Sequence, residues 1–348
     1  MKETNTLVIG AGQAGLAASY HLQSRGTTPL IVEANQQPGG SWRDYYDSLQ
    51  LFSPAQFSSL PGLPFPGNPN RYPTRDDTVN YLNQYAAHLN LDIAYNQRVT
   101  NISFHDDTHR IVGENMNISA RNVIVATGSY ANPYTPAIPG MSTFTGTVMH
   151  AAHYRNPKKF EGHHIAVVGA GNSAVQIACE LAPHAHVTLY SRAPLTWRKQ
   201  RILNRDVHWW LIHSGYDFLP VKKLLPPHVP VIDSGNYQEA FRNRTLTNKP
   251  MFHAVEGNSL INADGQRSSA DTIIFATGYK PHLPFLHNTP AVNHSGMPLH
   301  KNGISTTVPR LGYVGLEYQR TFASATLRGV GRDAKRVVKN LTKTRNND

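Results

Sequence analysis

The chain has 348 residues, which is enough to bury more than one core, and roughly 150 residues per domain predicts about two domains. Hydrophobic residues make up 40% of the chain without any run near the roughly 18 residues of a membrane span, so we expect a cytoplasmic protein. The net charge of +11 is spread along the chain without a helix-turn-helix, zinc-finger or RNP pattern, which argues against nucleic acid as the partner.

Short aliphatic runs predict the strands of an α/β fold. The first run covers residues 6–9, and a helix is expected over residues 13–23 until Gly26 ends it. Runs without polar alternation indicate strands covered on both faces, and hence parallel sheets between helices. The further strands are predicted at residues 30–32, 123–125, 165–168, 187–189, 273–275 and 311–314, with helices near residues 173–181 and 323–341.

The first predicted strand leads into the glycine-rich turn Gly10-Ala-Gly12-Gln-Ala-Gly15. In a βαβ nucleotide fold the first glycine permits the turn, the second lets a pyrophosphate approach, and the third lets helix and strand pack closely. Glu33 stands eighteen residues after Gly15, where a side chain meets the adenosine ribose. A carboxylate there accepts hydrogen bonds from ribose hydroxyls and repels a 2′-phosphate, which predicts FAD or NAD.

A second turn, Gly169-Ala-Gly171-Asn-Ser-Ala174, follows the strand at residues 165–168. Arg192 stands eighteen residues after Ala174, and Ser191 precedes it. A guanidinium forks onto a 2′-phosphate and the hydroxyl adds a donor, which predicts NADP, although a solvated arginine after a strand is the simpler alternative. Two dinucleotides of different type in one chain indicate a flavoprotein that is reduced by NADPH.

The repeated strand, turn and helix predict two Rossmann-like dinucleotide-binding domains, with the NADPH domain inserted into the FAD domain. Residues 150–164 are polar and basic and are interpreted as the linker from the FAD domain to the NADPH domain. Residues 281–309 are interpreted as the return to the FAD domain. We therefore expect the FAD domain at residues 1–154 and 281–348, and the NADPH domain at residues 155–280. Two turns of one kind, Ala126-Thr127-Gly128 and Ala276-Thr277-Gly278, each end a predicted strand and match the duplication.

Two other features of the chain are given structural interpretations. Residues 194–262 contain Trp197, Trp209 and Trp210, which could line a substrate path, but packing of an accessory subdomain is favoured. Cys179 is the single cysteine, so no dithiol can relay electrons, and a packed, inert thiol is expected.

The string from Phe144 to Tyr154 spells FxGxxxHxxxY, with His150 in its centre. Together with Gly39-Gly40-Ser41-Trp42, Leu51-Phe52-Ser53-Pro54 and the two turns, it resembles the class B flavin-dependent monooxygenases, and the short bacterial CzcO-like flavoproteins in particular. The resemblance extends over nearly the whole chain. Ketone-inserting Baeyer-Villiger members carry a tryptophan at the position of Tyr154, so the tyrosine favours heteroatom oxygenation.

The resemblance implies the chemistry of an NADPH-fed FAD monooxygenase. NADPH reduces FAD, O₂ forms a C4a-hydroperoxyflavin, and this species oxygenates a thioether sulfur or an amine nitrogen of a small molecule. No metal and no protein nucleophile are implied, and His150 is expected to couple the domains. An NADPH oxidase or reductase without oxygen transfer and a non-catalytic redox-sensing flavoprotein are the alternatives. The oligomeric state stays open, a homodimer being one option.

The same resemblance and the two turns give the expected site residues. The residues expected at FAD are Gly10, Gly12, Gln13, Ala14, Gly15, Glu33, Gly40, Ser41, Trp42, Val99, Ala126, Thr127, Gly128 and Ser324. Those expected at NADP are Gly169, Gly171, Asn172, Ser173, Ala174, Ser191, Arg192, Thr277 and Gly278. Supporting roles near the flavin are expected for Phe52, Ser53 and Asn172. Because Phe52 replaces an asparagine of the animal-type enzymes, a short lifetime of the oxygenated flavin is expected.

Overall fold

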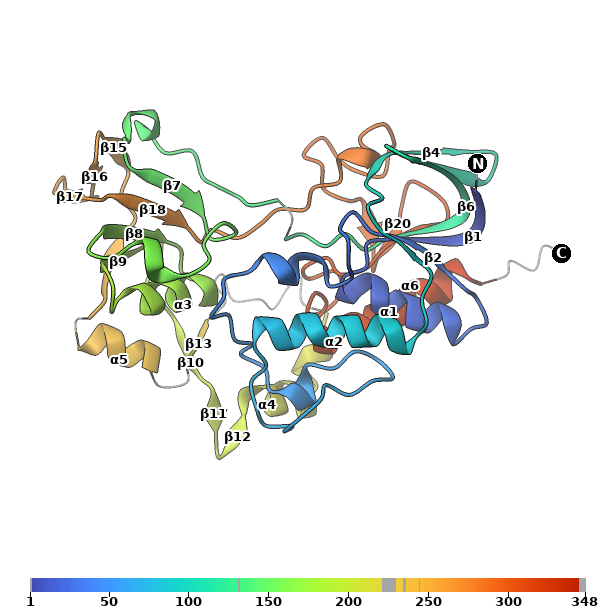
Figure 1. Ribbon diagram of the computed structural model, residues 1–348, viewed down its shortest axis with the longest axis horizontal. Helices are drawn as coiled ribbons and strands as arrows, with labels where there is room; N and C mark the ends of the chain where they lie inside the picture. Colours follow the sequence, from blue (N-terminus) through green and yellow to red (C-terminus); the bar gives the residue numbers. More distant parts are fainter. Residues whose placement is uncertain (1, 131, 221–229, 234–235, 244, 344–348) are drawn as a thin grey trace.

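The computed structural model describes residues 2–343 except 131, 221–229, 234–235 and 244. The chain forms two lobes, each built around a sheet with a parallel centre (Figure 1). Two segments connect the two sheets, and the described part of residues 200–220 also extends from the smaller lobe to contact the larger one. The predicted α/β class with Rossmann-type nucleotide folds is confirmed.

The larger sheet has nine strands within the described residues. Its parallel centre is formed where residues 7–9 of β1 pair with residues 30–32 of β2 on one side and residues 123–125 of β6 on the other. These aliphatic residues are buried on both faces, which explains why their sequence lacks polar alternation. Its strands are β1 (Lys2–Ile9), β2 (Leu30–Val32), β3 (Ile93–Ala94), β4 (Val99–His105), β5 (Thr108–Gly113), β6 (Met116–Val125), β19 (His300–Lys301), β20 (Ile304–Ser305) and β21 (Leu311–Tyr313).

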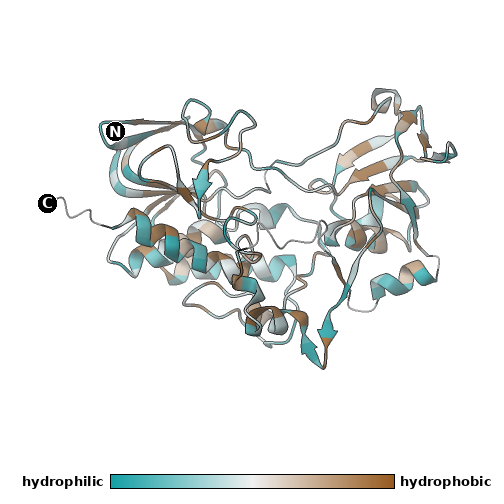
Figure 2. Ribbon diagram, turned by 180° about the vertical axis from the view of Figure 1, so that it is seen from behind, coloured by the Kyte–Doolittle hydropathy of each residue, from teal (hydrophilic) through white to brown (hydrophobic). Residues whose placement is uncertain are grey.

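The smaller sheet is parallel throughout, in the order β14-β9-β8-β18-β7. Figure 2 shows hydrophobic residues along its strands, which are buried between helices and loops. Its strands are β7 (Thr147–His150), β8 (His164–Val168), β9 (His186–Ser191), β14 (Thr247–Pro250) and β18 (Thr272–Phe275). Short ladders form apart from the two large sheets. β10 (Trp197–Lys199) pairs with β13 (Val231–Asp233), and β11 (Arg201–Ile202) pairs with β12 (Arg205–Asp206). β16 (Ser259–Ile261) lies between β15 (Ala254–Glu256) and β17 (Arg267–Ser269) and pairs with both.

The helices cover the sheets, and α1 packs between α2 and α6 on the larger one (Figure 1). The helix expected from residue 323 begins only at Leu327, because the Ser324 hydroxyl accepts hydrogen bonds from the amides of Arg320 and Thr321 and closes a turn there. The α2 helix begins at a capping box between Thr74 and Asp77. The helices are α1 (Gln13–Gln23), α2 (Arg75–His88), α3 (Asn172–Leu181), α4 (Val207–His213), α5 (Asn236–Arg242) and α6 (Leu327–Leu341). None of the described helices combines the length and apolar character needed to cross a bilayer.

The chain crosses between the lobes earlier than the sequence suggested. It leaves the larger sheet after Val125, enters the smaller one at Thr147, and returns after Phe275. The two crossing segments lie side by side, since the Tyr134 amide donates to the carbonyl of Gly278 at 3.0 Å. The crossing expected at residues 150–164 is therefore wrong: that stretch connects β7 to β8 within the smaller lobe, and it combines exposed polar residues with the buried Tyr154 and Phe160. The division into domains stays a proposal, and we move its first boundary from residue 154 to before Thr147.

A buried histidine predicts that the fold is sensitive to acid. His109 on β5 donates from Nε2 to the Pro309 carbonyl at 3.1 Å, and burial lowers its pKa from 6.5 to about 4. Above pH 6.5 the ring is neutral in both the folded and the unfolded chain. As the pH falls toward 4, the unfolded chain binds a proton at His109 and the folded chain does not. This difference lowers the free energy of unfolding by up to about 3 kcal/mol. Urea denaturation at pH 7.5 and 4.5 measures this loss. His109→Gln should depend less on pH, and equal pH dependence of the two proteins would contradict the assignment.

Candidate functional site

Two glycines of the first glycine-rich turn, Gly15 and Gly12, have different steric surroundings. A Cβ on Gly15 would lie 1.8 Å from the carbonyl oxygen of Gly10, so the packing of α1 on the turn itself requires glycine. A Cβ on Gly12 would meet only Gly40, at 3.7 Å from its Cα and 4.0 Å from its amide nitrogen, and Gly12 has an ordinary φ of −77°. The fold therefore does not require glycine at Gly12, which leaves the close approach of a ligand to the backbone as its reason.

A second segment lies against this turn. The Gly39 amide donates to the Ala11 carbonyl at 3.0 Å, and the Trp42 indole donates to Gln13 Oε1 at 2.9 Å. Gln13 in turn donates to the carbonyl of Ala325 at 2.6 Å. The structure thus brings together the first turn, the Gly39–Trp42 stretch and the residues next to Ser324. The Ser324 hydroxyl itself accepts hydrogen bonds from amides of its own turn.

The carboxylate predicted to meet the ribose lies over the same turn. Glu33 is 5% exposed; its Oε2 accepts from the Ala11 amide at 2.6 Å and its Oε1 from the Asn35 amide at 2.9 Å. The Gln97 amide donates to the Glu33 carbonyl, which brings the buried Val99 nearby.

Two buried polar side-chain atoms near the first turn are unpaired. Within the described residues Gln97 Oε1 and Thr127 Oγ1 are buried without a hydrogen-bond partner, and the Cα of Thr127 would lie 3.4 Å from a Cβ on Gly10. Buried polar atoms without partners are costly, so they indicate a ligand with hydrogen-bonding groups. Space at Gly12, a carboxylate for ribose hydroxyls and these unpaired atoms together fit FAD.

A cavity of about 870 Å³ opens between the lobes. It begins at the amino end of α3, where backbone N–H groups and the helix dipole favour an anion. Ala174 is fully buried beneath it. The other residues expected at NADP all line it: Gly169, Gly171, Asn172, Ser173, Ser191, Arg192, Thr277 and Gly278.

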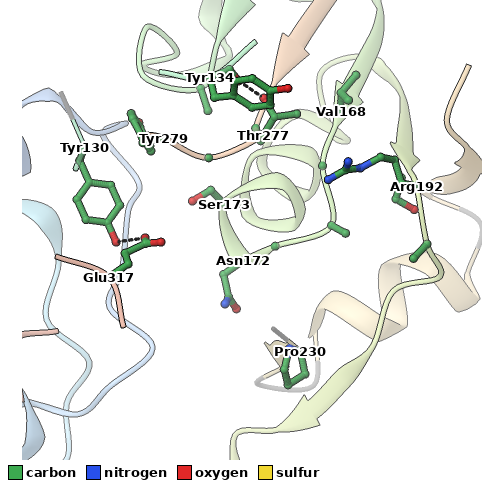
Figure 3. A pocket seen from close by; sticks show the side chains of 18 of the residues that line it. Tyr130, Tyr134, Val168, Asn172, Ser173, Arg192, Pro230, Thr277, Tyr279 and Glu317 are labelled. Atoms are coloured by element: carbon green, nitrogen blue, oxygen red, sulfur yellow. Dashed lines mark hydrogen bonds between the residues drawn. The ribbon is translucent and has the colours of Figure 1, made fainter. Parts of the chain in front are cut away.

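Arg192 is exposed in this cavity and makes no hydrogen bond or ion pair with the described part of the chain. Figure 3 shows its guanidinium pointing from the end of β9 toward the turn before α3. Gly171 in that turn has nothing within 4 Å of where its Cβ would stand. The hydroxyl of Ser191, in contrast, is buried and accepts a hydrogen bond from Asn248 at 3.2 Å. The arrangement leaves space and a free cation for a phosphate.

His150 holds the returning segment to the smaller lobe. Its Nε2 donates to the Gly278 carbonyl at 3.1 Å and its Nδ1 accepts from the Ala152 amide at 3.1 Å, so the ring is neutral. Burial lowers its pKa, which favours the same state. Thr277 donates to the Tyr134 carbonyl (Figure 3). His150 thus joins the returning segment to β7, and Thr277 joins the two crossing segments to each other.

The remaining expected residues separate into those at the cavity and those away from it. Phe52 lines the cavity, is 38% exposed and stacks on His208 with ring centres 6.0 Å apart. Asn172 also lines it, while its Oδ1 accepts from the Ile232 amide at 3.0 Å and fixes β13. The Ser53 hydroxyl lies 2.9 Å from that of Ser58, and Ser53 is outside the cavity lining. Tyr154 is buried and donates to Glu180 at 2.9 Å.

Sequence reasoning missed most of the aromatic wall of the cavity. Tyr130 donates to Glu317 at 3.1 Å across the gap between two segments (Figure 3). Burial raises the pKa of Tyr279 to about 12, so it stays a neutral phenol. Tyr279 ends the Ala276-Thr277-Gly278-Tyr279 turn, and Tyr45 stands three residues after Trp42, so the proximity of both to recognised motifs was the available signal. The wall also includes Tyr46, Tyr216, Tyr318 and Phe322.

The comparisons with known proteins agree with this arrangement. A family model described as pyridine nucleotide-disulphide oxidoreductase matches residues 7–211. An uncharacterized CzcO-like oxidoreductase of Geobacillus kaustophilus is 32% identical over 97% of this chain and 98% of its own length. A probable indole-3-pyruvate monooxygenase, YUCCA1 of Arabidopsis thaliana, is 30% identical over 84% of this chain and 80% of its own. The solved flavin-containing monooxygenase of Stenotrophomonas maltophilia is 31% identical, with a TM-score of 0.88 over 98% of this chain and 99% of its own.

The thiol chemistry named in the family description has no counterpart here. Cys179 is the only cysteine of the sequence, and burial raises its pKa to about 12. A protonated, packed thiol without a partner cannot exchange with a disulfide. Any electrons must therefore leave the bound cofactors by another route.

Proposed function

The chain belongs to the pyridine nucleotide-disulphide oxidoreductase family and is a class B flavin-dependent monooxygenase with FAD and NADPH as cofactors, and from this premise we propose that it oxygenates a soft heteroatom. The acceptor is the sulfur of a thioether or the nitrogen of an amine in a small molecule, and O₂ is the second substrate. FAD, when bound, supplies the acceptance of hydride and the activation of O₂. The residues of the chain bind, orient and exclude water.

One observation carries this proposal: a single cavity joins the free guanidinium of Arg192 to the apolar ring of Phe52. Arg192 and the amino end of α3 would hold the phosphates of NADPH, while Asn172 and Ser173 border the space toward the flavin. The aromatic wall beyond Phe52 would keep water from the reacting atoms and accept an apolar substrate. The residues predicted at FAD are proposed to hold it along the first glycine-rich turn, between Glu33 and Trp42.

Two alternatives predict different products from the same cofactors. An NADPH oxidase or reductase would use the Arg192 region but transfer no oxygen to an organic acceptor. A redox-sensing flavoprotein would bind FAD without turning over NADPH. The open, lined NADP cavity favours an enzyme over a sensor, because a sensor needs no site for a hydride donor.

The test is an assay of the purified, yellow holoprotein with NADPH against a panel of sulfides, amines and ketones. We expect an oxygenated sulfide or amine, identified by its mass, in excess over H₂O₂. Stoichiometric H₂O₂ with every acceptor would favour the oxidase, and negligible NADPH consumption would favour the sensor. A colourless protein that FAD cannot reconstitute would remove the proposal altogether.

A further inference from the structure

The β11–β12 hairpin carries an apolar tip that is open to solvent. The hairpin projects from the lower edge of the molecule (Figure 1), and Figure 2 shows a hydrophobic tip between hydrophilic strands. Leu203 at the tip is 81% exposed, more than any other large hydrophobic side chain in the described part of the chain. Ile202 beside it is 43% exposed. Neither residue lines the cavity between the lobes, so the proposed function does not account for them.

Leu203 also has a backbone conformation that leucine disfavours. Two residues, Leu203 and Asn204, connect the paired strands, and their φ angles are +48° and +59°. A two-residue turn with both φ angles positive is of type I′, in which asparagine and glycine are preferred. Asn204 suits this turn, whereas the Cβ of Leu203 is strained there and its side chain gains no burial in return. The folding of the chain therefore gives no reason for a leucine at this position, which indicates a contact outside the chain.

Two tryptophans of α4 support the hairpin from behind. The Trp210 indole N–H donates to the Ile202 carbonyl at 3.0 Å, and the guanidinium of Arg205 lies over the Trp209 ring at 5.4 Å. Both indoles are half-buried and therefore also reach the solvent. The tip is thus held in its conformation before any partner binds, which lowers the entropy lost on binding.

The charge around the tip is positive. Lys199 just before the hairpin and Arg201 and Arg205 within it are exposed and form no ion pair with the described part of the chain. Asp206, the acidic residue of the hairpin, is buried and accepts a hydrogen bond from the Tyr72 hydroxyl at 2.6 Å. The hairpin therefore presents an apolar tip with cations beside it and no exposed carboxylate of its own, in a chain with a net charge of +11.

We propose that the β11–β12 hairpin is a peripheral anchor that docks on the surface of an anionic membrane. Ile202 and Leu203 enter the headgroup boundary, where apolar side chains leave water and tryptophan rings are favoured, and the neighbouring cations contact lipid phosphates. A second copy that met it hairpin to hairpin would oppose the same cations, which favours the bilayer as the occupant. The contact requires no spanning helix and is reversible, with an association constant on the order of 10⁴ M⁻¹. It is independent of the proposed function.

The experiment measures cosedimentation of the purified holoprotein with vesicles of phosphatidylcholine, alone or mixed in equal parts with phosphatidylglycerol. We expect the wild type to bind the mixed vesicles, to bind phosphatidylcholine alone much more weakly, and to lose the difference as salt is added, since salt screens exposed charges. Leu203→Asn should weaken binding to the mixed vesicles about 10-fold, because the apolar tip is lost. Met297→Asn removes an exposed apolar side chain from the larger lobe and should leave binding unchanged.

Thermal unfolding separates a docking residue from a structural one. Asparagine suits the left-handed conformation at position 203, so Leu203→Asn should melt at or above the temperature of the wild type although it binds vesicles less well. The double variant Lys199→Gln, Arg201→Gln tests the charges: binding to the mixed vesicles should weaken about 25-fold, from about fivefold per cation, and binding to phosphatidylcholine alone should not change.

Three outcomes would overturn the anchor. The wild type might as well be a protein without lipid contacts if it leaves the mixed vesicles in the supernatant. Wild-type binding by Leu203→Asn, with binding lost only in the double variant, would reduce the contact to attraction between charges and remove the role of the tip. A dimer that Leu203→Asn converts to a monomer in sedimentation velocity, without vesicle binding, would assign the tip to an interface between copies. Oxygenation assays without vesicles decide the proposed function separately, since none of these variants alters the cavity lining.

Discussion

Arg192→Ala should raise KM for NADPH by about 10- to 100-fold, the equivalent of the roughly 1.5–3 kcal/mol of a hydrogen bond to a charged group. The guanidinium lines the cavity without a protein partner, so its removal leaves no buried charge behind and the cost falls on the ligand alone. KM for NADH should stay nearly constant, because NADH lacks the 2′-phosphate. Steady-state kinetics with both nucleotides measure the ratio.

Two further variants define what that result means. Arg192→Lys should recover part of the loss, since an ammonium keeps the charge but not the forked geometry. Arg201→Ala removes an exposed arginine of the β11–β12 hairpin outside the cavity lining and serves as the matched control for net charge. Equal effects of Arg192→Ala on NADPH and NADH would discard the phosphate role.

Gly15→Ala and Gly12→Ala should fail in different ways. At Gly15 the new Cβ would stand 1.8 Å from a backbone oxygen, so α1 must move and we expect a loss of about 3 kcal/mol or more, with little folded protein. At Gly12 the space is open, and without FAD the stability should fall by no more than about 1 kcal/mol. FAD affinity of Gly12→Ala should nevertheless drop on the order of 100-fold, because its methyl occupies the path of the pyrophosphate.

Thermal unfolding with and without added FAD, together with the flavin content of the purified proteins, distinguishes the two variants. Gly12→Ala should melt near the wild-type apoprotein and gain little from FAD. Wild-type flavin content in Gly12→Ala would place the pyrophosphate elsewhere. Unfolding of Gly12→Ala to the same extent as Gly15→Ala would show that the turn is limited by its own packing at both glycines.

The local elements were predictable because their causes lie within a few residues of one another. The turn from Gly10 to Gly15 combines a strand, glycines and a helix that was predicted at about residues 13–23 and is observed there. The offset to Glu33 and to Arg192 is a property of one βαβ unit, so a single stretch of sequence shows it. The structure places Glu33 over the first turn and Arg192 in the cavity; their ribose and phosphate roles stay predictions.

The crossing segments could not be located from local composition. Residues 150–164 connect two strands of the smaller sheet, and their exposed polar residues resemble those of a linker although Tyr154 and Phe160 are buried. Residues 126–130 and 132–146 lead from the larger sheet to the smaller one without any period that would distinguish them from a loop. The pairing of Tyr134 with Gly278 joins positions that are distant in sequence. Polarity reports exposure to water, which surface turns and linkers share.

By itself the sequence determined the two nucleotide turns, their contrasting charges and the α/β class, since each depends on contacts between near neighbours in the chain. Only the tertiary structure decided what faces the space between the lobes. Phe52, His208 and Arg192 line one cavity because three separate segments converge there. Burial and mutual orientation are properties of the assembled fold, and no spacing along the chain encodes them.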